Sequence, residues 1–134
     1  MMAQSGSKPG SPDYIDEAVE EIKARLPERV DNYTQLSDVK GTRNGFEYTL
    51  RLVHSPTATV THEWLERTKL LLAGQSCDNQ RTRAELDAGL TMNYVVRGKD
   101  NRIAGRFFIS EAICQKALSP VQQSQSSLTL PTIE

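Results

Sequence analysis

The sequence predicts an α+β domain, in which helices pack on one face of an antiparallel sheet of about four strands. Three features predict this fold: an amphipathic helical segment near the N-terminus, and two stretches in which apolar and polar residues alternate beside a turn. The expected order of elements is α-β-β-α-α-β-β. Hairpins separated by helices favour such a layered arrangement, with the second face of the sheet open to water.

Residues 12–26 predict the first helix. Their apolar side chains recur at spacings of three and four residues and therefore share one helical face: Ile15, Val19, Ile22 and Leu26. Ser11 is expected to cap this helix, with Pro12 at its first position, and Pro27 is expected to end it. We interpret the apolar face as one that packs on the core rather than on a partner protein.

Residues 36–53 predict the first hairpin. Asn44-Gly45 lies at its turn, where this dipeptide tolerates the positive φ angles of tight turns. After the turn, every second residue is apolar, which indicates a half-buried strand: Phe46, Tyr48, Leu50 and Leu52. The strand before the turn has a weaker pattern, and Gly41 there extends the loop or marks a bulge.

Residues 54–60 form the expected connector to two further helices. Thr61 is expected to cap the first of these helices, which ends near Gly74. Its apolar residues are Trp64, Leu65, Leu71 and Leu72. The second helix covers residues 81–88 and ends at Gly89. Its charged side chains are interpreted as a solvent-exposed surface: Arg81, Arg83, Glu85 and Asp87.

A second hairpin is expected from two strands, residues 90–97 and 103–110, joined by a turn at residues 98–101. In the first strand, the residues that share one face are Leu90, Met92, Tyr94 and Val96. In the second strand, Phe107 and Ile109 share one face. A short helical turn around Cys114 completes the predicted domain.

Length and composition bound the function. The 134 residues fit one domain at residues 12–118, between polar segments at 1–11 and 119–134 that are predicted to be disordered. The chain has Lys+Arg 16 and Asp+Glu 17, and the resulting net charge of -1 argues against a nucleic-acid partner.

The sequence shows no transmembrane segment and no export signal. It also shows no phosphate-binding loop or catalytic signature, and we expect no cofactor.

Two groups of residues are candidates for a site. Arg97, Lys99, Arg102 and Arg106 cluster around the second hairpin, either as a patch for an anionic ligand or partner or as charges that protect a sheet edge. His54 and His62 flank the connector. A metal or general-base role would require carboxylates such as Glu63 or Asp38 to converge on them. We expect both histidines to be exposed instead.

Cys77 and Cys114 are the only cysteines. The long stretch between them contains no CxxC pair and no histidine cluster, so they do not indicate a zinc site or a thioredoxin-type redox pair. On the residues alone, a disulfide and two buried free thiols remain as alternatives.

The segment from Cys77 onward resembles a family of small bacterial exported or envelope proteins of uncharacterised function. The resemblance is carried by a cysteine, a short helix ending in Leu-x-x-Gly, two strands and a closing cysteine, here Cys77, 85–91, Tyr94, Asp100-Asn101, 107–109 and Cys114. Residues 26–50 also resemble the front half of that family. Family members often carry glycine where this chain has Asn101, and usually carry an export signal or membrane anchor.

This resemblance implies a Cys77–Cys114 disulfide in a two-cysteine α+β domain of the bacterial envelope. The absence of a catalytic motif, the small stapled fold and the polar tails favour a non-enzymatic domain that binds another protein, for example as an accessory to a secretion or surface assembly. The expected location is periplasmic or envelope-associated, with a cytoplasmic location as the alternative. Two other functions remain open: an immunity or inhibitor protein against a secreted toxin, and an enzyme with an unrecognised site near His54 and His62.

Overall fold

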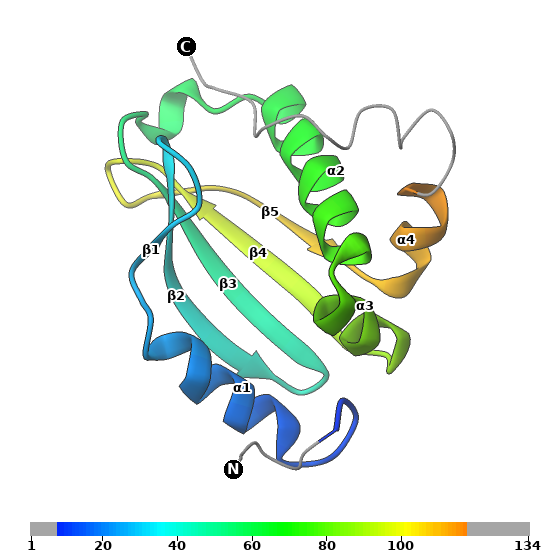
Figure 1. Cartoon of the computed structure of the whole chain (residues 1–134). Helices are drawn as coiled ribbons and strands as arrows, with labels where there is room; N and C mark the ends of the chain where they lie inside the picture. The colour runs from blue at the N-terminus through cyan, green and yellow to red at the C-terminus, as the bar shows by residue number, and fades with distance from the viewer. Residues whose placement is uncertain (1–7, 118–134) are drawn as a thin grey trace.

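The computed structural model describes residues 8–117 (Figure 1). The predicted C-terminal tail lies outside these residues, as does most of the predicted N-terminal segment. The helices are α1 (Tyr14–Lys23), α2 (His62–Asp78), α3 (Gln80–Asp87) and α4 (Glu111–Ala117), with a 3-10 turn, η1, at Thr57–Thr59. The strands are β1 (Glu28–Arg29), β2 (Thr34–Thr42), β3 (Gly45–Leu52), β4 (Thr91–Arg97) and β5 (Ile103–Ile109). Among the described residues, no helix is both long enough and apolar enough to cross a membrane.

The sheet confirms the predicted α+β class and differs from the prediction in two details. Its strands lie in the order β1-β2-β3-β4-β5, so the described sheet has five strands rather than about four. The additional strand, β1, has only two residues and pairs with the start of β2. The two predicted hairpins join through β3 and β4, which are parallel, whereas the other neighbouring strands are antiparallel.

The helices cover one face of this sheet (Figure 1). A Cβ added at Gly41 of β2 would lie 2.8 Å from Ile15 of α1, and one added at Gly105 of β5 would lie 2.5 Å from Leu65 of α2. Gly41 is paired with Phe46, and Gly105 is in register with Leu50 through β4, so both glycines lie on the face that carries the alternating apolar residues. Glycine at these positions allows each helix to approach the sheet closely.

The core lies between this face and the helices, as the alternation predicted. Its largest fully buried apolar side chains are Phe46, Leu52, Leu86, Met92, Ile109, Val39 and Val96. Tyr48, Tyr94 and Phe107 are in register on three adjacent strands, and their rings stack with centroids 5.2 Å apart at each step. These cross-strand aromatic contacts stabilise the centre of the sheet.

The predicted helix boundaries are partly wrong. Helix α1 begins at Tyr14 after Asp13, which makes no side-chain cap hydrogen bond, rather than at Pro12 after Ser11. Helix α2 does not end near Gly74 but continues to Asp78, with Gly74 buried inside it. Its N-terminus was predicted correctly, because the Thr61 hydroxyl accepts a hydrogen bond from the Trp64 amide at 3.0 Å.

Helix α3 is capped at both ends, and it ends at Gly89 as predicted. The Asn79 side chain caps its N-terminus by accepting the Arg81 and Thr82 amides at 3.0 and 3.1 Å. At its C-terminus Gly89 has a φ of 95°, and the amide of the following Leu90 bonds the Glu85 carbonyl at 3.0 Å. This pattern is a Schellman cap, which ends the helix and turns the chain into β4.

The first hairpin turn was predicted for a reason that is wrong. Among the described non-glycine residues only Asn101 has a positive φ, and Gly45 does not have one either. Gly45 is instead required by close contact, since a Cβ there would lie 2.0 Å from the Thr91 carbonyl oxygen. The bulge in this hairpin lies between Leu36 and Asp38 rather than at Gly41.

Candidate protein-binding surface

The four predicted basic residues all belong to the β4–β5 hairpin, and we call them the basic hairpin surface (Arg97, Lys99, Arg102 and Arg106). Arg97 and Arg106 line a depression of about 530 Å³ on the sheet face opposite the helices. Val95, the register partner of Arg106, lies at its base and is only 6% exposed. The Arg97 guanidinium donates to the Asn101 carbonyl at 2.7 Å and is thereby held beside the turn.

Lys99 and Arg102 lie in the turn itself, which the connector before α2 holds in place. The Lys99 amide donates to the Ser55 carbonyl at 2.8 Å, and the Thr57 hydroxyl oxygen lies 3.1 Å from the Arg102 carbonyl oxygen. Asp100 accepts hydrogen bonds from both the hydroxyl and the amide of Thr57. Both bonds lower the pKa of Asp100 below its ordinary value, and the bond from the hydroxyl has the larger effect.

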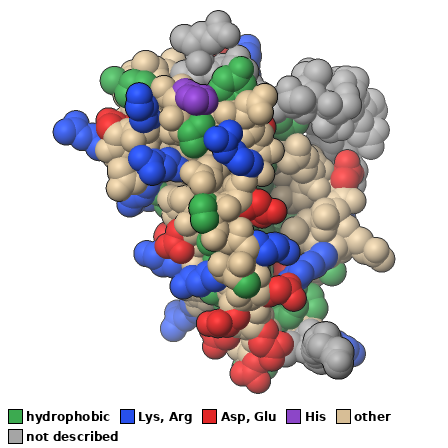
Figure 2. Space-filling view, turned by 60° about the vertical axis from the view of Figure 1, so that its left-hand side comes forward, with side chains coloured by type: hydrophobic (Ala, Val, Ile, Leu, Met, Phe, Trp, Pro, Cys, Tyr) green, Lys and Arg blue, Asp and Glu red, His purple; other side chains and the backbone are tan. Residues whose placement is uncertain are grey.

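The structure adds a fifth cation that the sequence analysis missed. Arg51 of β3 donates to the Lys99 carbonyl at 3.0 Å, although the two residues lie far apart in the sequence. The sequence could have indicated this residue, because Arg51 lies between Leu50 and Leu52 in an alternating strand and therefore on the polar face of that strand. Figure 2 shows Lys and Arg side chains over much of one side of the molecule and acidic side chains gathered at its lower end.

The two histidines are exposed, as expected, and the proposed carboxylates do not converge on them. The His54 ring packs edge-on against Tyr33 with centroids 6.2 Å apart. Glu63 pairs with Arg67 at 3.2 Å, and Asp38 lines the depression on the open face of the sheet. Within residues 8–117, no group of three or more His, Cys, Asp or Glu side chains is placed to hold a metal ion.

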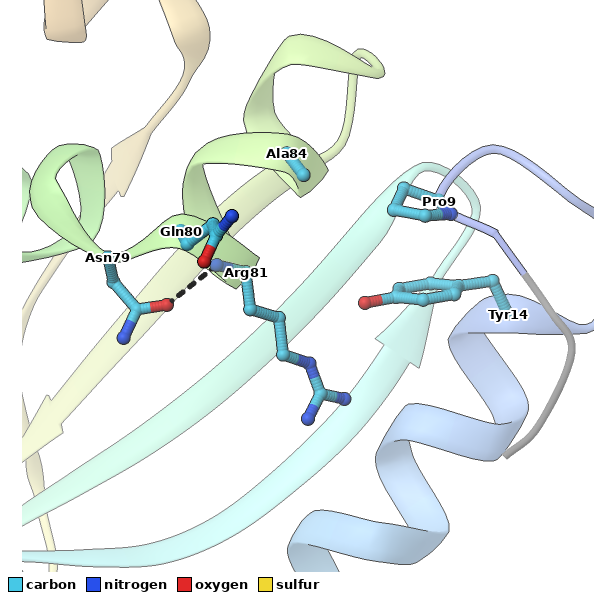
Figure 3. A pocket seen from close by; sticks show the side chains of 6 residues that line it. All are labelled: Pro9, Tyr14, Asn79, Gln80, Arg81 and Ala84. Carbon is cyan, nitrogen blue, oxygen red and sulfur yellow. Dashed lines mark hydrogen bonds between the residues drawn. The ribbon is translucent and has the colours of Figure 1, made fainter. Parts of the chain in front are cut away.

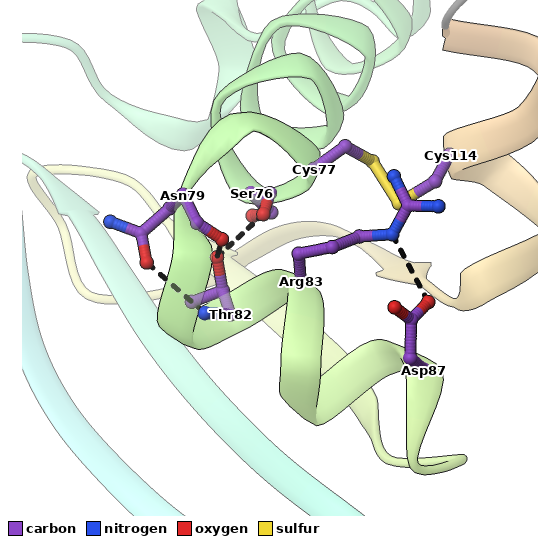
Figure 4. Close-up of a disulfide and its surroundings, with 7 residues drawn as sticks. All are labelled: Ser76, Cys77, Asn79, Thr82, Arg83, Asp87 and Cys114. Carbon is purple, nitrogen blue, oxygen red and sulfur yellow. Dashed lines mark hydrogen bonds and ion pairs between the residues drawn. A yellow bond between two sulfur atoms is a disulfide. The ribbon is translucent and has the colours of Figure 1, made fainter.

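The two cysteines form a disulfide that joins the end of α2 to α4 (Figure 4). Their Cα atoms are 5.5 Å apart, and the side chains are 7% and 0% exposed. The pairing implied by the family resemblance is therefore present. It closes a unit that contains α3, β4 and β5, and so ties the β4–β5 hairpin to the helical layer.

Glu85 is the polar residue that the sequence analysis placed wrongly. It was assigned to a solvent-exposed surface, but it is 3% exposed and its carboxylate accepts a hydrogen bond from the Tyr14 hydroxyl of α1. Arg81 lies 3.6 Å from this carboxylate and 2.8 Å from that of Glu21 on α1. Figure 3 shows Tyr14 and Arg81 extending toward one another between α1 and α3.

Burial dominates the electrostatics of this cluster. It raises the pKa of Glu85, although the hydrogen bond from Tyr14 and the nearby Arg81 charge act in the opposite direction. Burial, followed by the hydrogen bond to Glu85, likewise raises the pKa of Tyr14. In this cluster Tyr14 of α1 and Arg81 of α3 both contact the Glu85 carboxylate, and Arg81 also pairs with Glu21 of α1. We interpret the cluster as a link between α1 and α3.

Three solved structures share this fold. A pilotin of the Vibrio vulnificus type 2 secretion system, EpsS, is 18% identical with a TM-score of 0.62, over 74% of this chain and 86% of that chain. The Vibrio cholerae type II secretion system pilotin AspS is 12% identical with a TM-score of 0.59, over 73% and 86%. A Pseudomonas aeruginosa protein described as secreted is 13% identical with a TM-score of 0.57, over 75% and 88%.

These identities are low, so the likeness shows a common fold. No family model and no curated protein sequence matches the chain. The fold is thus one found in small secretion-system and secreted proteins, which agrees in broad terms with the resemblance to small envelope proteins.

Proposed function

We propose that this protein is a non-enzymatic domain of the bacterial envelope that binds another protein, as an accessory to a secretion or surface assembly. The observation that carries the proposal is the fold shared with two type 2 secretion-system pilotins over 86% of each of those chains. The buried disulfide supports an oxidising compartment such as the periplasm, because disulfides are rare in reducing cytosol.

The basic hairpin surface is the proposed contact with the partner. Arginine is enriched at protein interfaces, where its planar guanidinium binds carboxylates through two hydrogen bonds. None of the ion pairs found within the described residues includes Arg97, Lys99, Arg102 or Arg106. Their charges are therefore available for a partner that presents acidic side chains.

Affinity capture from an envelope extract tests the function. The tagged chain should repeatedly recover one component of a secretion or surface assembly. The double charge reversal R97E/R106E should reduce that recovery at least about tenfold. It would set two acidic side chains opposite the acidic side chains of the partner, and such like-charge contacts are unfavourable at interfaces. The matched control is K23E/R25E, which reverses two exposed charges at the C-terminal end of α1.

Two results would count against different parts of the proposal. Repeated capture that returns no specific envelope protein would remove the accessory function. Equal loss of recovery in the R97E/R106E and K23E/R25E variants would leave the function standing but would exclude the basic hairpin surface as its contact.

A further inference from the structure

The two edges of the sheet differ in a way that bears on how a partner binds. On one side the sheet ends in β1, which has two residues, both charged, directly after Pro27. A very short strand with charges and an adjacent proline is a poor template for a further strand. β1 itself is therefore protected against pairing with another chain, although it covers only Gln35 and Leu36 of β2.

The opposite edge has fewer of these protections. β5 contains seven residues, Ile103–Ile109, with no proline and with Arg106 as its one charged residue. Among the described strands it pairs only with β4. Phe108 is 53% exposed and Ile103 is 39% exposed. A long edge strand that exposes large apolar side chains is a site at which another chain can add as a strand.

The side chains of β5 indicate what such a strand would carry. Arg106 and Phe108 lie two positions apart, beside Val95 and Asn93 of β4, and therefore share the open face of the sheet. Ile103 lines the depression there together with Arg97 and Arg106. An added strand would bind most favourably with a carboxylate beside these arginines and apolar side chains beside Phe108 and Ile103.

A second copy of this chain, paired symmetrically about the centre of β5, fits the edge poorly. Arg106 is the central residue of β5, three positions from Ile103 and three from Ile109. Symmetric antiparallel pairing of two β5 strands about this centre would set Arg106 directly opposite its own equivalent. Like charges in directly opposed positions destabilise a strand pair.

We propose that the β5 edge takes an extended segment of the partner protein as an added strand, in which acidic and apolar side chains alternate. This inference rests on the proposed function and specifies the structural form of its partner. Backbone hydrogen bonds would supply the pairing, and contacts to Arg106 and Phe108 would select the segment.

Photo-crosslinking in the native bacterium tests the proposal. p-Benzoylphenylalanine replaces Phe108 in one full-length variant and Leu70, a 44% exposed residue of α2, in another. Peptide mass spectrometry of the cross-linked products then identifies the captured segment. The proposal expects capture at position 108 of a segment from another protein with alternating acidic and apolar residues, and little capture at position 70.

Other outcomes would overturn it in distinguishable ways. Capture at position 108 of β5 from a second copy would replace the partner strand with a dimer. Capture of a partner protein at position 70 alone would retain the proposed function and move its contact to the helical layer. No capture at either position would count against both the strand addition and the proposed function.

Backbone-modified peptides give a second, independent readout. A synthetic copy of the captured segment is N-methylated at every second residue in two complementary sets. Because an added strand uses only one of its edges, one set should weaken binding to the purified chain at least about tenfold, while the other changes it less than about twofold. Equal weakening by both sets, or by neither, would exclude strand addition.

Discussion

The Tyr14 hydroxyl donates a hydrogen bond to the buried Glu85 carboxylate and thereby joins α1 to α3 across 71 positions of sequence. Arg81 lies between the same two helices and pairs with both Glu85 and Glu21. A carboxylate that is 3% exposed requires such partners, because a buried charge without them is strongly destabilising. The contact therefore explains how a charged residue is accommodated beneath the N-terminal helix.

Removing the hydroxyl should be costly. The Tyr14→Phe substitution keeps the ring but leaves the Glu85 carboxylate without its donor, and we expect a loss of about 2 kcal/mol in the free energy of unfolding. Urea denaturation monitored by circular dichroism measures this loss of unfolding free energy. The control is Tyr33→Phe at a 41% exposed position, where the change should stay within about 0.5 kcal/mol. Equal effects of both substitutions would contradict the link.

The raised pKa of Glu85 predicts a pH dependence of stability. Burial raises this pKa above its ordinary value of 4.5, so the folded protein retains a proton over a range in which the unfolded chain has lost it. The stability from this group is therefore full below that ordinary value and falls as pH rises through the folded pKa. The Glu85→Gln variant lacks the titration, and its amide oxygen can still accept from Tyr14.

Unfolding free energies of both proteins, measured from about pH 4 to about pH 8, test the sign of this effect. The difference between them should shift in favour of the Glu85→Gln variant as pH rises. A difference that is constant with pH, or that shifts toward the wild-type protein, would show that the pKa of Glu85 is not raised in the folded state.

Local patterns in the sequence were sufficient to predict most elements, because alternation and capping depend on neighbouring residues. Phe46, Tyr48 and Leu50 correctly indicated the buried face of β3. The same alternation carries no information about which strand lies alongside, so the parallel pairing of β3 with β4 was not predicted. The continuation of α2 through Gly74 likewise depends on tertiary packing, which outweighs the weak helix propensity of one glycine.

The candidate surface and the buried cluster differ in how far sequence could predict them. The basic hairpin surface comes from one hairpin, so its residues were found together. Glu85 has Arg81 and Arg83 before it and Asp87 after it, and such a run is typical of a solvated helix surface. Its burial depends on Tyr14, which no local pattern connects to α3.

The disulfide predicts a large effect of removing both cysteines. Cys77 and Cys114 are 37 positions apart, and closing a loop of that length restricts the unfolded chain by an amount equivalent to about 4 kcal/mol. The Cys77→Ala/Cys114→Ala variant should lose about that much unfolding free energy in urea denaturation. Intact mass after thiol alkylation of the unfolded wild-type protein provides the check, since alkylation should require a reductant.

Asn101 tests the conformation of the β4–β5 turn. Its φ is 66°, a region in which asparagine is tolerated and in which glycine carries no steric penalty. The Asn101→Ala substitution should destabilise by about 1 kcal/mol, whereas Asn101→Gly should be nearly neutral. Thermal unfolding of the two variants compares them directly. An Asn101→Ala variant as stable as Asn101→Gly would contradict the left-handed conformation.

The Gly45→Ala substitution tests the junction of β3 with β4. The added Cβ would lie 2.0 Å from the Thr91 carbonyl oxygen and 2.7 Å from the Thr91 nitrogen, and backbone atoms cannot move aside as the end of a side chain can. We therefore expect a loss of about 3 kcal/mol or more in unfolding free energy. Hydrogen exchange should also accelerate at the Thr91 amide, which bonds the Asn44 carbonyl at 3.0 Å.

Gly105→Ala is the matched control, because the three atoms nearest to its added Cβ all belong to the Leu65 side chain, the closest at 2.5 Å. That side chain can change rotamer, so the expected loss is about 1 kcal/mol and exchange at Thr91 should not change. If both variants are equally destabilised and Thr91 exchange is unaffected in each, β3 and β4 do not approach as closely as Gly45 requires. A selective effect of Gly45→Ala would instead establish that this glycine permits the parallel junction on which the five-stranded order depends.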